Sequence, residues 1–159
     1  MITWTASLEI GVRAIDAEHK HLIEFINLVK LASERQRSIM KRDPKLLNDL
    51  KSLLQTHFER EEDLMFGIDY PDVNAHMTAH STLQSDLDAK ILESEQSGDA
   101  DCAIGFVSTW IVGHMKTEDT KLAQFIQKKK EAKARAVAAK AAPKSAADMA
   151  KAIAQKGKR

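Results

Sequence analysis

The chain has 159 residues, 30% of them charged and 5% aromatic, with a formal net charge of +1. This length favours one domain, and the small numbers of aromatic, glycine and proline residues favour an all-helical protein. A single cysteine, Cys102, excludes an intrachain disulfide and favours a reducing cytoplasm, and we expect neither a signal peptide nor a transmembrane segment.

The first 15 residues show no sustained helical period and are expected to form an extended arm, with Gly11 allowing a turn. The apolar residues of this arm are Trp4, Leu8 and Ile10. From about residue 16 to residue 36, a helical stripe contains His19 among Ile15, Leu22, Ile23, Ile26 and Val29. His21 lies about 200° around that helix from His19, so we expect it to point outward.

Three further amphipathic helices are predicted. The second begins at Asp43 and Pro44, as N-cap and first helical residue, and ends at 67–71. The third runs from about 72 to 98, and the fourth from about 99–102 to 126. Their inner faces contain Leu46, Leu47, Leu50, Leu53, Leu54, Phe58, Leu64, Val73, Leu83, Leu87, Ile91, Ile104, Val107, Ile111, Leu122 and Ile126. Short loops favour an all-α, up-down-up-down four-helix bundle over residues 1–126.

A basic tail of different composition follows the predicted bundle. Residues 127–159 hold 11 Lys and Arg and two Asp and Glu, a net charge of +9, so residues 1–126 carry −8. The tail is rich in alanine and lysine, and too few apolar residues remain for a core. We expect a solvated, partly helical or disordered extension, in which Ser145 and Asp148 could cap a short helix. Its functional alternative is contact with an anionic membrane or nucleic-acid surface, without specific nucleic-acid recognition.

Seven residues with metal-ligating side chains are spread over the four predicted helices. They are His19, His57 and Glu61, His76 and His80, and His114 and Asp119. Two residues four apart share a helix face and can bind one site, although a single such pair is more often structural. Here every pair interrupts an apolar stripe, and buried imidazoles and carboxylates are costly unless something binds them. Together they predict a metal site inside the bundle.

This ligand set favours two metal ions over one. Five imidazoles and two carboxylates exceed what one tetrahedral zinc ion needs, and no thiolate fits the pattern. Two octahedral ions that share both carboxylates and one oxo or hydroxo bridge would use all the side chains and leave one position open. We therefore expect an asymmetric pair of ions with a place for a small molecule on one of them.

The spacing of His114 and Asp119 predicts a distortion of the fourth helix. Five residues at about 100° each place these side chains about 140° apart on a regular α-helix. Both can reach one centre if the helix contains a π-bulge, a feature often found at functional sites. We therefore predict a π-bulge near residues 114–119.

The ordered ligand set resembles that of the hemerythrins. Trp4, the stretch from Ile15 through Asp16, Glu18 and His19 to Lys20, and the pair Tyr70 and Pro71 resemble the single-domain bacterial members, the bacteriohemerythrins. The resemblance covers about residues 1–126, with all seven ligand positions present, and leaves the tail outside.

The resemblance implies a non-haem di-iron protein that binds O2 reversibly. One iron would take His76, His80 and His114, the other His19 and His57, with Glu61 and Asp119 bridging them. O2 would bind at the open position of the two-histidine iron, as a hydroperoxide hydrogen-bonded to the oxo bridge. Trp110 and Ile111 match family positions around the ligand pocket, and ordinary core packing is the alternative interpretation of both. An apolar wall there would limit water and slow autoxidation.

The sequence favours an O2 carrier, storage or delivery protein over an enzyme. Di-iron oxidases and ferritins use carboxylate-rich Glu-x-x-His motifs, and the one such spacing here, Glu18 with His21, involves the outward histidine. Of the nearest other polar residues, Glu62 is interpreted as a surface charge and Tyr70 as a packing residue. An O2 or redox sensor, or an iron storage or detoxification protein, remains the alternative. We expect a monomer that gives O2 to an unidentified consuming partner.

Overall fold

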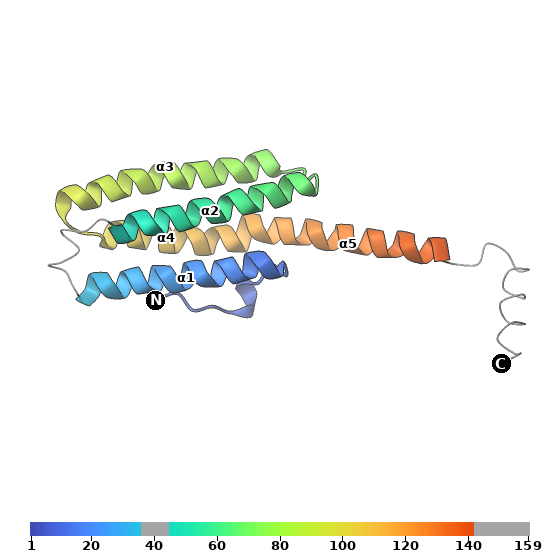
Figure 1. Cartoon of the computed structure of the whole chain (residues 1–159), viewed down its shortest axis with the longest axis horizontal. Helices are drawn as coiled ribbons and strands as arrows, with labels where there is room; N and C mark the ends of the chain where they lie inside the picture. The colour runs from blue at the N-terminus through green and yellow to red at the C-terminus, as the bar shows by residue number, and fades with distance from the viewer. Residues whose placement is uncertain (36–44, 142–159) are drawn as a thin grey trace, which may run out of the picture. The chain divides into compact units, whose positions relative to one another are not determined.

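The computed structural model describes residues 1–35 and 45–141, and within these ranges all regular structure is helical (Figure 1). Three helices come first: α1 (Arg13–Arg35), α2 (Lys45–Gly67) and α3 (Val73–Ser97). The fourth consists of α4 (Asp101–His114), a π-helical segment η2 (Met115–Asp119) and α5 (Thr120–Ala141). A 3-10 turn, η1 (Ala6–Leu8), precedes them. The predicted all-α four-helix bundle is confirmed.

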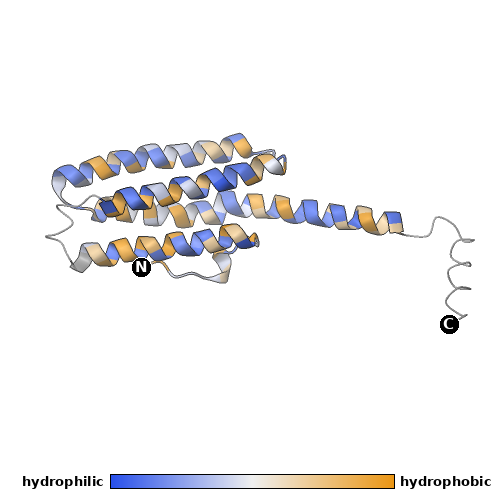
Figure 2. Ribbon diagram, viewed as in Figure 1, coloured by the Kyte–Doolittle hydropathy of each residue, from blue (hydrophilic) through white to orange (hydrophobic). Residues whose placement is uncertain are grey.

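Each helix of the bundle packs on the next one along the chain, and α4 also packs on α1. Apolar residues line the shared interior, while polar residues cover the outer faces of the helices (Figure 2). The core includes Leu22, Ile26, Val29, Leu50, Leu54, Phe58, Leu83, Leu87, Ala103, Ile104, Val107, Ile111 and Met115. Burying each larger apolar side chain contributes about 1.5–3 kcal/mol, so this interior holds the four helices in register.

The N-terminal arm is held against the bundle by hydrogen bonds as well as by apolar contact. The Ile2 backbone exchanges two hydrogen bonds with the Asn27 side chain, of 2.8 and 2.7 Å. The Asp16 carboxylate accepts hydrogen bonds from the backbone N–H groups of Ile10 and Gly11, at 2.7 and 3.1 Å. Gly11 has a φ of +74°, as a turn there requires. The η1 turn of the arm packs on η2.

The helix boundaries differ from expectation by small amounts. α1 begins at Arg13, and α3 ends where Gly98, with a φ of 70°, donates a hydrogen bond to the Ser94 carbonyl. The predicted start of the second helix at Asp43 and Pro44 lies outside the described residues. Some residues expected inside are only half-buried, namely Leu46, Leu53, Leu64, Val73 and Ile126. On α2, Met65 beside Leu64 is fully buried.

The helix that follows η2 continues well beyond residue 126. The chain forms two compact units, residues 1–124 and 125–159. In the second unit α5 continues to Ala141, and residues 127–141 are all exposed. Alanine and lysine are strong helix formers, so the helix continues although its apolar stripe has ended. The proposed cap at Ser145 and Asp148 lies beyond the described part of the chain. No helix within that part is long and apolar enough to cross a membrane.

Candidate metal centre

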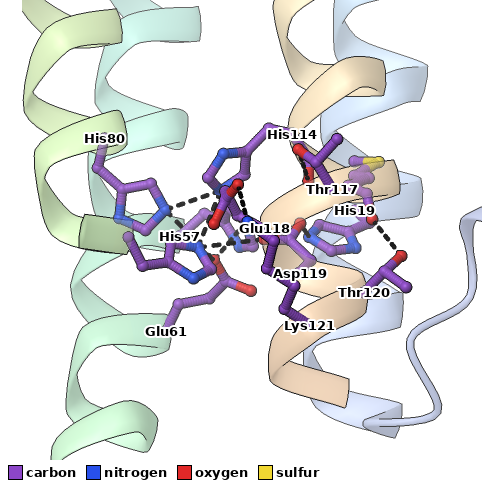
Figure 3. Close-up of polar contacts among 12 residues, drawn as sticks. His19, His57, Glu61, His80, His114, Thr117, Glu118, Asp119, Thr120 and Lys121 are labelled. Carbon is purple, nitrogen blue, oxygen red and sulfur yellow. Dashed lines mark hydrogen bonds and ion pairs between the residues drawn. The ribbon is translucent and has the colours of Figure 1, made fainter. Parts of the chain in front are cut away.

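All seven predicted ligand side chains lie together in the interior of the bundle (Figure 3). α1 contributes one, α2 two, α3 two, α4 one and η2 one. None is more than 5% exposed; the set is His19, His57, Glu61, His76, His80, His114 and Asp119. Residues separated by a hundred positions therefore meet in one buried cluster.

Three histidines converge on one point at the α3 and α4 side of the cluster. The Nε2 atoms of His76 and His114 lie 2.9 Å apart, and those of His80 and His114 lie 3.0 Å apart. Two nitrogens that each lie about 2.1 Å from one ion at a right angle are about 3.0 Å apart. Two of the three imidazole pairs therefore have the spacing of neighbouring ligands on one ion, and a Glu61 oxygen lies close enough to all three to join them.

Two histidines form a second group beside the first. Ligand atoms of His19, His57 and Glu61 lie close enough together to hold an ion, so Glu61 belongs to both groups. The Asp119 carboxylate also faces both groups. Its Oδ1 atom lies 3.0 Å from His114 Nε2, and its Oδ2 atom lies 3.3 Å from His19 Nε2. Glu61 and Asp119 thus stand between a three-histidine group and a two-histidine group.

The π-helical segment η2 brings Asp119 to the same centre as His114. In a regular α-helix these side chains would diverge by about 140°, whereas the wider turn of Met115–Asp119 lets both point inward. The Thr120 hydroxyl donates a 3.0 Å hydrogen bond to the Met115 carbonyl, five residues earlier. The predicted distortion near residues 114–119 is therefore confirmed.

Six donor atoms of the cluster lack hydrogen-bond partners within the described ranges. These buried atoms without a hydrogen-bond partner are both oxygens of Glu61, both oxygens of Asp119, and the Nε2 atoms of His19 and His57. Leaving a buried polar group unpaired costs about 1–3 kcal/mol, and more for a charged one. A bound cation would satisfy these atoms together, so the donor set fits a metal.

The electrostatics of the cluster also require positive charge. Burial and the neighbouring Asp119 raise the pKa of Glu61, but the surrounding histidines, His76, His80 and His57, together lower it to about 2. Burial raises the pKa of Asp119 too, yet the surrounding histidines hold it well below its usual range. Burial lowers the pKa of His76, but Asp119 and Glu61 raise it to about 9. Two ionised carboxylates thus need protons or metal ions between them.

Two further carboxylates orient ligand histidines from outside the cluster. His57 Nδ1 lies 3.1 Å from a Glu18 oxygen, and the other Glu18 oxygen accepts a 2.7 Å hydrogen bond from Arg60. His80 Nδ1 lies 2.9 Å from Glu62. An Nδ1–H donated to a carboxylate leaves the Nε2 lone pair facing the centre, as a metal ligand requires.

The interpretation of Glu62 as a surface charge is therefore wrong, and the role of Glu18 was missed. Glu18 and Glu62 are both about one-quarter exposed or less, so neither carries a clear burial signal in sequence. The only signal in the sequence was that each glutamate lies next to a predicted ligand: Glu18 precedes His19, and Glu62 follows Glu61. His21 is exposed, as expected, and Tyr70 is a buried packing residue.

Two aromatic side chains pack on the three-histidine group. Phe58 stacks on His80 with ring centroids 3.9 Å apart, and Trp110 stacks on His114 at 4.4 Å. Trp110 and His114 line a surface groove of about 360 Å³, whereas Ile111 is fully buried in the core. The ring contacts of Trp110 are thus with this side of the cluster.

Comparisons with known proteins agree with the buried cluster. Residues 10–126 match the family model of the hemerythrin HHE cation binding domain. A hemerythrin-like protein of Naegleria gruberi is 30% identical over 118 residues, covering 74% of this chain and 87% of the relative. A bacteriohemerythrin of Clostridium acetobutylicum is 27% identical over 124 residues, covering 75% and 96%. One of Pseudomonas aeruginosa is 26% identical over 121 residues, covering 74% and 76%.

Proposed function

Because the chain belongs to the hemerythrin family, we propose that it binds O2 reversibly at a non-haem di-iron centre and carries, stores or delivers it. The observation that supports this most is the pair of unequal ligand groups sharing Glu61 in a buried interior. Family membership and this histidine-glutamate cluster together indicate an iron-binding protein. The pair of irons, the role of each ligand and the reversibility are the proposal.

In this proposal the two groups hold one iron each. His76, His80 and His114 bind the first, and His19 and His57 bind the second. Glu61 and Asp119 would contribute ligand oxygens to both, since each carboxylate faces both groups. Irons held there would supply the electrons that O2 accepts, and the two-histidine group would leave room for O2 beside its iron. The unequal number of imidazoles determines which side is open.

The remaining residues keep O2 binding reversible. Phe58 stacks on His80 and is buried, and Ile111 and Met115 of the fourth helix are buried as well. These apolar side chains would limit the access of water, which favours irreversible loss of electrons from the irons. Glu18 and Glu62 accept Nδ1–H hydrogen bonds and hold His57 and His80 in the tautomer that presents Nε2. With five imidazoles among seven ligands, this centre differs from the carboxylate-rich centres of oxidases. We therefore propose a binding protein and not an enzyme.

Repeated oxygenation tests this proposal. The iron-loaded full chain is reduced without air, exposed to O2 and then purged, while its visible absorption is followed over several cycles. A carrier develops colour with O2 and loses it again on purging, with the same amplitude each time. An iron storage protein or oxidase would turn over and release ferric ion, water or peroxide. Colour that purging does not reverse contradicts the proposal.

A further inference from the structure

The exposed part of α5 carries a concentrated positive charge that O2 binding does not use. Among residues 127–141 there are six cations and one acid, and every one of these side chains is exposed. The cations are Lys128, Lys129, Lys130, Lys133, Arg135 and Lys140. We propose that this helical segment, the basic α5 segment, binds the phosphate backbone of duplex nucleic acid without reading its sequence.

The charges of the segment are rigidly spaced along a helix. Fifteen residues at about 1.5 Å each extend about 22 Å, and a duplex carries one phosphate charge per about 1.7 Å of its axis. The single acid of the segment, Glu131, accepts a 2.9 Å hydrogen bond from the Gln127 amide. With six exposed cations and one acid, the segment carries a net charge of +5 on a solvent-exposed helix.

The composition favours a nucleic-acid backbone over a membrane surface. A helix that lies in a membrane interface needs a face of large apolar residues beside its cations. Between residues 127 and 159 the only large apolar residues are Val137, Met149 and Ile153. Alanine fills the remaining apolar positions and contributes little to insertion. Phosphate contact needs only the cations and is independent of base identity.

The segment belongs to a larger basic region outside the family match. The hemerythrin domain match ends at residue 126. Residues 142–159 add five further cations and one acid by sequence. The attraction would therefore be a property of this chain's extension, separate from the iron site, and would place the O2-binding domain beside nucleic acid. This inference does not depend on the proposed function.

Binding of the full chain to duplex DNA tests the proposal. The probe is a fluorescent duplex of mixed sequence, about 30 base pairs long, followed by anisotropy at increasing salt. Neutralising three phosphates gives a slope of about −2.7 in log affinity against log salt, so affinity falls about 40-fold between about 50 and 200 mM salt. A second arm uses vesicles of phosphatidylglycerol and phosphatidylcholine with no nucleic acid.

Two matched variants locate the binding surface. One replaces Lys130, Lys133 and Arg135 with glutamine, which preserves helix propensity and can be checked by circular dichroism. The control replaces Arg13, Lys20 and Lys45, three exposed cations of α1 and α2, and removes the same charge. We expect at least a tenfold loss of duplex affinity in the first variant and less than a twofold change in the control.

Four results would overturn the proposal. They are no duplex binding at low salt, unchanged binding by the α5 variant, an equal loss in the control, and tighter binding to the anionic vesicles than to the duplex. The last would assign the segment to a membrane surface.

Discussion

Replacing Glu18 with glutamine tests whether an outer carboxylate supports metal binding at the two-histidine group. Glu18 accepts a hydrogen bond from His57 Nδ1 at 3.1 Å, and Arg60 holds its other oxygen at 2.7 Å. Glutamine retains an oxygen acceptor but loses the negative charge, and its amide can place an N–H donor against the imidazole. Loss of a residue that orients a metal ligand costs about 10–100-fold in metal affinity.

The geometry places the expected effect at the lower end of that range. The Glu18 side chain is 21% exposed and Arg60 is 61% exposed, so solvent screens part of the charge. We therefore expect Glu18→Gln to weaken the second metal by about tenfold, or about 1.4 kcal/mol, and Glu18→Ala to weaken it further. Arg60→Ala, which only releases the carboxylate, should weaken it by about twofold to threefold.

Anaerobic titration of the metal-free chain with Fe(II) or Co(II) measures this effect. The three-histidine group has one more imidazole and should fill first, so the second binding step reports on His19 and His57. Glu24→Gln, an exposed change on the same helix, is the matched control and should leave both steps unchanged. If Glu18→Gln binds its second metal within twofold of the unaltered chain, the proposed role of Glu18 is wrong.

Three further predictions address the centre and the tail. Glu61→Ala should lose bound iron, because it removes the carboxylate shared by both groups. His21→Ala, the control, should keep two irons per chain when the metal content is measured. Two irons per chain in both variants would refute the ligand assignment. In the metal-free chain, the pKa of Glu61 is lowered from 4.5 to about 2, so its ionised carboxylate stabilises the fold at pH values above 4.5, and this contribution should be lost as the pH falls toward 2. Thermal unfolding measured between these two pH values should show the loss in the unaltered chain relative to Glu61→Gln. An equal pH dependence in both proteins would contradict the prediction. Deleting residues 127–159 should leave O2 binding unchanged in the oxygenation cycles, since the ligands all precede this segment; a changed O2 affinity would show that the tail does more than extend from the domain.

The sequence predicted the ligand cluster because its members are polar residues at positions where the helical pattern is otherwise apolar. Histidines and carboxylates at inward positions of apolar stripes are costly without a bound ion, so their positions alone indicated a shared centre. The spacing of five residues between His114 and Asp119, which does not fit one face of a regular α-helix, was equally informative. Helix geometry predicted that η2 would be distorted, and the structure contains the π-helical turn there.

The outer carboxylates could not be predicted in the same way. Glu18 and Glu62 stand at partly exposed positions where glutamate is common, and their contacts depend on how α1, α2 and α3 pack. Sequence spacing describes neighbours on one helix but not the rotation of one helix against another. The sequence predicted a partly helical tail but not where its helix would end, because burial ends near residue 126 while helix propensity continues.

Mössbauer spectroscopy of the chain loaded with iron-57 and equilibrated with O2 tests the central claim most directly. If three imidazoles bind one iron and two bind the other, with O2 on the second, the two irons have different surroundings. The spectrum should then contain two quadrupole doublets of equal area, from two irons per chain. One doublet, unequal areas or a single iron per chain would contradict a di-iron centre that binds O2 on one side.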